Sequence, residues 1–145
     1  TIVVAPPTAT LSSNRSSVKS GVNVPANMVS ATLTWTSTNA TSVSITSLTN
    51  VGLSGSQVVY PGATTTYTLQ ASNALSSATQ NVTIQVSKIG DIVSPAGTID
   101  IFDYSALVAD FGKSGSQLAN PASDLDEQHG VTIFDYSILV ANFGR

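Results

Sequence analysis

The chain of 145 residues contains no cysteine and only one histidine. Without cysteine it forms no disulfide and offers no thiolate to a metal ion. The single histidine, His129, lies among acidic residues, and no Ser-His-Asp pattern or pair of carboxylates stands apart from the metal-loop pattern described below. We therefore expect a protein that is not an enzyme and has no catalytic residues.

Charge is scarce and unevenly distributed. No acidic residue occurs before residue 91, so residues 1–90 carry a charge of +3, whereas residues 91–145 have two basic and eight acidic side chains and a charge of −6. This asymmetry indicates two modules with separate roles. The chain has no cluster of basic residues with which to follow a phosphate backbone, which argues against a nucleic-acid partner.

Long apolar runs are also missing. No stretch approaches the roughly 20 apolar residues that cross a bilayer, so we expect no membrane span. The chain begins at Thr1 without a signal-peptide pattern, and we interpret it as a mature or excised piece whose targeting segment is missing. A composition rich in Ser, Thr and Ala and free of cysteine favours a secreted protein on a bacterial cell surface.

Residues 8–88 contain short runs in which apolar residues alternate with Ser and Thr. The runs are 9–13, 30–37, 41–47, 56–60, 65–72 and 80–87. This period of two predicts half-buried antiparallel strands, and the turn residues between the runs predict a β-sandwich. The inward-facing residues would be Leu33, Trp35, Val43, Ile45, Tyr67, Leu69, Val82, Ile84 and Val86. Residues 1–7 are either a linker or, through TIVV at 1–4, an additional strand that adds to a neighbour's sheet.

The stretches LTWTSTNATSVSI and GSQVVYPGATTTYTLQASN resemble bacterial immunoglobulin-like modules of cell-surface proteins. The resemblance implies an immunoglobulin-like β-sandwich at 8–88 that acts as a spacer. We interpret Trp35, Tyr60 and Tyr67 as core residues rather than as a platform for stacking sugars.

The phrase FDYSALVADFG at 102–112 recurs as FDYSILVANFG at 134–144. In both copies the apolar residues recur at helical spacing, and a glycine (Gly112 or Gly144) follows the last of them, which predicts two helices. The predicted buried stripes are Ile101, Tyr104, Leu107, Val108 and Phe111, and Ile133, Tyr136, Leu139, Val140 and Phe143. Each unit is too small to bury its own stripe, so we expect the two copies to cover each other.

The residues before each helix suggest a metal loop. The stretch DLDEQHGVTIFD at 124–135 has acids at positions 1, 3 and 12, Gln128 at 5 and Thr132 at 9, the spacing of a calcium loop. His129 occupies position 6, where a sharp turn favours glycine, and Gly130 comes one place later. In the first copy, only a one-residue insertion makes Asp91 the first ligand. The alternative is that these acids are solvated or cap the helices, with Asp100 or Thr132 as N-cap.

Residues 90–145, with GDIVSPAGTIDIFDYSALVADFG and SDLDEQHGVTIFDYSILVANFG, resemble a dockerin. The resemblance implies a small all-α domain at 89–145 with two EF-hand-type calcium loops and a cohesin-like protein as partner. It places Ca²⁺ ligands at Asp124, Asp126, Gln128, Thr132 and Asp135, and at Asp91, Ser94, Asp100 and Asp103. It places partner contacts at Ile101, Phe102, Val108, Ala109 and Lys113, and at Ile133, Phe134, Val140, Ala141 and Arg145.

Of the functions that the sequence leaves open, two are favoured over a third, glycan binding by the sandwich through an exposed aromatic pair. The first is a non-catalytic adhesion or assembly module in which a spacer presents the dockerin-like domain. The second is the repeating subunit of a self-assembling cell-surface filament, whose partner is another copy of the chain. The Ile-Phe pairs at 101–102 and 133–134 either form an apolar partner surface or are buried between the helices, and the helical stripe predicts burial of Val108 and Val140.

Overall fold

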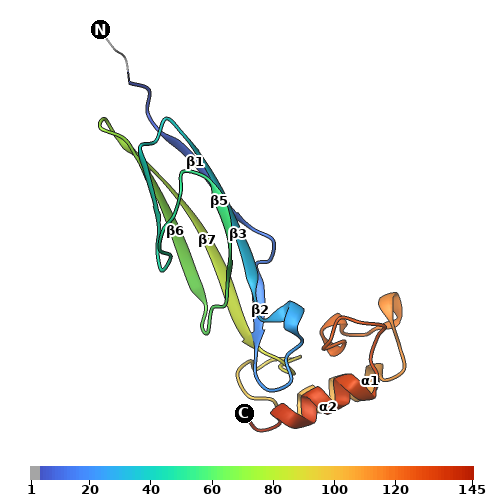
Figure 1. Ribbon diagram of the computed structural model, residues 1–145. Coiled ribbons are helices and arrows are strands. Elements are labelled where there is room, and N and C mark those ends of the chain that lie inside the picture. Colours follow the sequence, from blue (N-terminus) through green and yellow to red (C-terminus); the bar gives the residue numbers. More distant parts are fainter. Residues whose placement is uncertain (1–3) are drawn as a thin grey trace. The chain divides into compact units, whose positions relative to one another are not determined.

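The computed structural model describes residues 4–145, which form two compact units (Figure 1). The first unit comprises the described residues up to Val18 together with Ser30–Val86, and the second comprises Lys19–Val29 and Ser87–Arg145. Of the helices in this described part, none has the length and apolar character needed to cross a membrane.

The strands form two sheets. One sheet has the order β1-β3-β5 and the other β2-β7-β6-β4. The pairs β1/β3, β3/β5, β4/β6 and β6/β7 are antiparallel. The strand bounds are Thr8–Ser13 (β1), Ser17–Ser20 (β2), Ala31–Thr38 (β3), Ser42–Ile45 (β4), Gly55–Val59 (β5), Thr65–Ser72 (β6) and Ser77–Lys88 (β7).

The alternating sequence explains the core of the first unit. Alternate residues are buried at 31, 33 and 35 of β3 and at 67, 69 and 71 of β6, with Leu33 and Leu69 fully so, and residues from both sheets form one cluster. Trp35 is buried, and its indole N–H donates to the Gly52 carbonyl at 3.0 Å. On the outer face, hydroxyls pair across strands, as between Thr66 and Thr83 at 2.8 Å. The predicted β-sandwich is therefore confirmed as two packed sheets.

Two details of the first unit differ from the predictions. Strand β2 was not predicted, because SVKS carries a single apolar residue and shows no alternation. Tyr60 is not a core residue, since it follows the end of β5 and is 70% exposed, whereas Trp35 and Tyr67 are buried as predicted. Of the additional strand proposed at residues 1–4, residues 1–3 lie outside the described part of the chain.

The second unit contains the two predicted helices, α1 (Ile101–Asp110) and α2 (Ile133–Asn142), and the short 3-10 helices η1 (Ala26–Met28), η2 (Gly115–Gln117) and η3 (Pro121–Ser123). Both long helices begin with the predicted capping boxes, in which Asp100 or Thr132 is the N-cap. Past their ends, Gly112 and Gly144 have φ values of 79° and 76°, the left-handed conformation that favours glycine.

The boundary between the units differs from the predicted one in one respect. Residues 19–29, which the sequence predicts to belong to the first module, group with the second unit. Met28 in this segment is fully buried in the core of the second unit, and Val24 packs against that core. The second unit is therefore built from two stretches of chain, because the residues after 87 do not supply its whole core.

Candidate functional site

The two repeats of the second unit pair reciprocally. After α1, the Gly112 N–H donates to the Val131 carbonyl at 2.8 Å, and after α2 the Gly144 N–H donates to the Ile99 carbonyl at 2.8 Å. The rings of Tyr104 and Tyr136, which are equivalent in the repeats, meet edge to face with centroids 6.1 Å apart. The two repeats are therefore joined by equivalent contacts, one set from each copy.

The loop before α2 is folded back onto the start of the helix by Asp135. This side chain is fully buried, and its Oδ1 accepts hydrogen bonds from the N–H groups of Leu125 (2.7 Å) and Asp126 (3.2 Å). Its Oδ2 accepts from the Thr132 N–H at 2.8 Å and from the Thr132 hydroxyl at 3.1 Å. Because an ionised carboxylate can accept several such bonds, Asp135 sets the path of the loop.

Three carboxylates converge in this loop. One oxygen each from Asp124, Asp126 and Asp135 lies within 4.8 Å of the other two. The Gln128 N–H donates to Asp124 at 3.1 Å and to Asp126 at 2.9 Å, and the Gly130 N–H donates to Asp124 at 3.1 Å, so the loop wraps around these oxygens. A cluster of hard oxygen donors suits a cation such as Ca²⁺, although the same donors also suit other hard divalent ions.

The electrostatics of the cluster also favour a cation. Burial raises the pKa of Asp126 because it disfavours the charged carboxylate, and the negative charges of Asp135 and Asp124 raise the pKa further. A cation between the three carboxylates would reverse this mutual repulsion. A hollow beside the cluster is lined by Asp126, Gln128, His129, Thr132 and Phe134.

The misplaced glycine of the loop has a structural explanation. His129 has a φ of 68° and thus adopts the left-handed conformation that glycine favours at this position of a calcium loop. Gly130 has a φ of 89°, and a Cβ there would lie 2.3 Å from the Lys113 carbonyl oxygen. The chain after α1 passes so close to residue 130 that only glycine fits there. His129, one position earlier, therefore adopts the left-handed turn conformation that a calcium loop usually gives to glycine.

The first loop has the one-residue insertion that the sequence left open. Asp103 Oδ1 accepts from the N–H groups of Ile92 and Val93, as Asp135 accepts from Leu125 and Asp126. Asp91 accepts from the Gly97 N–H at 2.8 Å, as Asp124 accepts from Gly130. Asp91 thus takes the place of Asp124, and the additional residue is Thr98, which precedes the paired residue Ile99.

This register leaves the first loop with fewer candidate ligands than the second. Val93 stands in the place of Asp126 and Ser94 in that of Glu127, while Asp100 caps α1 by accepting from the Phe102 N–H at 2.8 Å. Within residues 4–145, three acidic groups close enough to share an ion gather in the second loop alone. Any metal therefore has its best donors at Asp124, Asp126 and Asp135.

The helices expose a second candidate site. The side chains before the last loop acid are exposed in both copies: Ile101 58% and Ile133 60%, Phe102 63% and Phe134 68%. Val108 and Val140 lie two helical turns further along, and their side chains are 45% and 50% exposed.

The remaining predicted partner contacts are less uniform. Ala109 and Arg145 are exposed, and Ala141 and Lys113 are half-buried, with the Lys113 ammonium donating to the Ala109 carbonyl at 2.6 Å. We call these two sets the α1 face (Ile101, Phe102, Val108, Ala109, Lys113) and the α2 face (Ile133, Phe134, Val140, Ala141, Arg145).

The exposure of these faces corrects the predicted buried stripe. Ile101, Val108 and Phe111 are exposed, and their counterparts in α2 are too, so the predicted burial of Val108 and Val140 is wrong. The buried face of α1 instead carries Asp103, Leu107 and Asp110. The reason is that this face must hold the loops, whose backbone N–H groups require acceptors. The Ile-Phe pairs are likewise exposed and are not buried between the helices.

Comparison of the chain with protein-family models, with curated proteins and with solved structures finds no match.

Proposed function

We propose that the chain is a non-catalytic assembly module of the extracellular bacterial surface, in which an immunoglobulin-like sandwich is the spacer and the second unit is a dockerin-like domain that binds a cohesin-like protein. The observation that carries this proposal is the pair of equivalent apolar faces on α1 and α2. Each face leaves an isoleucine, a phenylalanine and a valine in solvent, at nearly the same exposure in the two copies.

Exposed apolar side chains are ordinary when they are scattered, but here three recur within two turns of each helix. Ile101 and Val108 are seven residues apart and so lie on the same side of α1, with Phe102 beside Ile101. A neighbouring group of aromatic and aliphatic side chains is typical of a protein interface, where burial of one such side chain contributes about 1.5–3 kcal/mol. That the duplication preserves these residues at the surface supports a role in binding, since the core does not use them.

Calcium has a defined place in this proposal. The residues Ile133 and Phe134 immediately precede Asp135, whose carboxylate belongs to the convergent acidic cluster. An ion held by Asp124, Asp126 and Asp135 would fix the loop against the first turn of α2 and thereby order the α2 face. The same acids would repel one another without an ion, so the docking surface would be less ordered after chelation.

Calorimetric titration of purified cohesin modules into the full chain, in millimolar calcium, tests the proposal. We compare the parent with Phe102→Ser, with Phe134→Ser and with the double variant. Tyr60→Ser is the matched control, because Tyr60 is an exposed aromatic of the first unit. If the faces are equivalent, each single variant retains binding through the other face at up to about twofold lower affinity, and the double variant loses it.

The results that would refute the proposal are equally specific. Binding that survives in the double variant would place the partner elsewhere on the chain. An equal loss in the Tyr60→Ser control would mean that the binding depends on general surface hydrophobicity. Failure of every cohesin module to bind the parent, with the faces intact, would remove the cohesin-like partner from the proposal.

A further inference from the structure

One position of the repeat is polar in both copies and belongs neither to the acidic cluster nor to the α1 and α2 faces. Asp110 near the end of α1 and Asn142 near the end of α2 are equivalent and are 0% and 1% exposed. Burying a polar side chain is costly unless it is hydrogen-bonded, so each of these residues needs partners in the interior.

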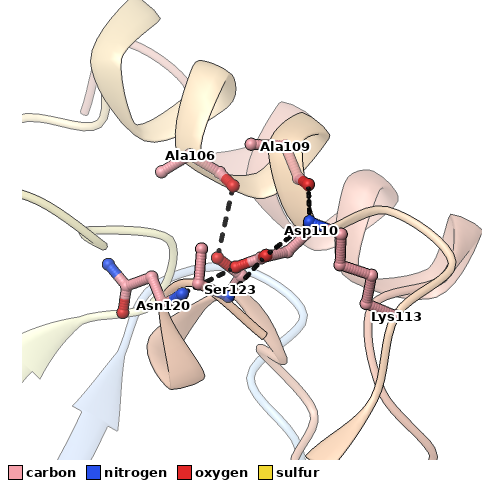
Figure 2. A network of polar contacts seen from close by, with 7 residues as sticks. Ala106, Ala109, Asp110, Lys113, Asn120 and Ser123 are labelled. Carbon is pink, nitrogen blue, oxygen red and sulfur yellow. Dashed lines mark hydrogen bonds and ion pairs between the residues drawn. The ribbon is translucent and has the colours of Figure 1, made fainter. Parts of the chain in front are cut away.

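Asp110 holds the segment after η2. Its Oδ1 accepts from the Ala119 N–H at 2.7 Å and its Oδ2 from the Asn120 N–H at 2.8 Å, and the Lys113 ammonium lies 3.4 Å from Oδ1 (Figure 2). These backbone hydrogen bonds lower the pKa of Asp110, so the carboxylate is ionised. Both backbone partners are donors, and an acceptor-only carboxylate is the side chain that satisfies them.

Asn142 holds a different segment. Its Oδ1 accepts from the Val22 N–H at 2.7 Å, and its Nδ2 donates to the Val22 carbonyl at 2.8 Å and to the Ile138 carbonyl at 2.8 Å. This partner presents one donor and one acceptor, which an amide matches and a carboxylate does not. Gly21 approaches so closely that a Cβ there would lie 2.6 Å from the Asn142 Oδ1.

The residue type at this position therefore matches the backbone groups that it binds. Asp110 binds two N–H groups, and Asn142 binds an N–H group and a carbonyl of the same residue. We propose that Asp110 and Asn142 are a pair of clamps, and that Asn142 makes residues 19–29 an obligate part of the second unit. The α2 face is then displayed only when a segment more than 100 residues earlier in the chain is in place. The burial of Met28 and the packing of Val24 in the same core support this dependence. The inference does not rest on calcium or on the identity of the partner.

Reciprocal substitutions in the full chain, followed by hydrogen exchange of individual amides, test the proposal. Asn142→Asp places an additional acceptor against the carbonyls of Val22 and Ile138, so we expect the amides of residues 20–29 to exchange about tenfold faster or more, and those of α2 to accelerate with them. Asp110→Asn is the matched control. It places an NH₂ group against one of the two backbone donors, so exchange should increase at residues 118–120 while the Val22 amide stays protected.

Three outcomes would overturn the proposal. The Val22 amide could exchange in Asn142→Asp as it does in the parent, both variants could open the same segment, or residues 20–29 could open while α2 stays protected. If Asn142→Asp does not fold, Asn142→Ala removes the same hydrogen bonds without adding a charge and is judged by the same amides. Faster exchange of Val22 together with α2 in that variant supports the clamp, and unchanged protection refutes it.

Discussion

Replacement of Asp126 by asparagine should change the stability of the second unit in opposite directions with and without calcium. The substitution keeps the size of the side chain and its carbonyl acceptor but removes one negative charge from the cluster with Asp124 and Asp135. Without a cation, that charge repels its two neighbours. With a cation, the same charge is part of the binding site.

The magnitude without a cation follows from the distances. Two unit charges 4.8 Å apart repel by roughly 1 kcal/mol in a water-like dielectric and by about 3.5 kcal/mol at an effective dielectric constant of 20. Asp126 is partly exposed, so solvent screening favours the lower end for each of its two pairs. We therefore expect Asp126→Asn to raise the free energy of unfolding by about 1–2 kcal/mol in excess chelator.

In calcium, the parent should instead be more stable than Asp126→Asn. At a calcium concentration 100 times the dissociation constant, the parent gains about 2.7 kcal/mol, and the variant, with one carboxylate fewer, gains much less. Asp91→Asn, the same chemical change at the first position of the other loop, which corresponds to Asp124, is the comparison. Because Asp91 is outside the cluster of three acids, this variant should not become more stable in chelator.

The assay is urea unfolding of the parent and both variants, in millimolar calcium and in excess chelator, followed over a range of pH. The folded-state pKa of Asp126 is raised above its ordinary value of 3.8, so the folded chain takes up this proton before the unfolded chain does. In chelator, the advantage of Asp126→Asn should therefore shrink as the pH falls through the raised pKa toward the ordinary value of 3.8. A variant that is less stable than the parent in chelator at neutral pH would refute the reasoning.

Two further predictions concern the loop conformation and the helix faces. His129→Gly should raise the free energy of unfolding by about 1 kcal/mol, because His129 has a φ of 68° that glycine adopts without strain; an unchanged or lower value in urea unfolding would contradict this. Leu139→Ala should lower the free energy of unfolding by about 2–5 kcal/mol because Leu139 is 0% exposed, whereas Val140→Ala, next to it but 50% exposed, should change it by no more than about 0.5 kcal/mol. Similar losses in these two variants would mean that Val140 is buried as deeply as Leu139.

Local patterns predicted the elements well. The alternation in β3 and β6 and the repeated helical phrase identified strands and helices within a few residues, since burial on one face imposes a period on the sequence. The capping boxes of Asp100 and Thr132 were predictable for the same reason, because the residues that satisfy a helix N-terminus lie next to it in the chain.

The direction of the helix faces was not predictable from hydrophobic periodicity. The pattern assumes that apolar side chains are buried and charged ones exposed, but α1 buries Asp103 and Asp110 and exposes Ile101 and Val108. These acids are buried because they bind backbone N–H groups of loops whose path no local pattern reveals. In this unit Asp103 and Asp110 therefore share the buried face of α1 with Leu107.

Long-range relationships were also hidden from the sequence. The hydrogen bonds between Asn142 and Val22 join residues 120 positions apart, and the first loop matches the second only after Thr98 is taken as an insertion. The repeated phrase aligned the helices but not the loops, because the loop residues differ and only the hydrogen bonds to Asp103 and Asp135 show which positions correspond.

The most direct test of the docking proposal is the molar mass of the purified chain, measured by light scattering in millimolar calcium and then in excess chelator. If the α1 and α2 faces serve a different protein, the chain should have the mass of a single copy under both conditions, also at high concentration. A mass many times that of one copy, lost when Phe102 and Phe134 are both replaced by serine, would show that the faces bind other copies of the chain. That result would contradict docking to a cohesin-like partner and would identify the chain as a self-assembling subunit.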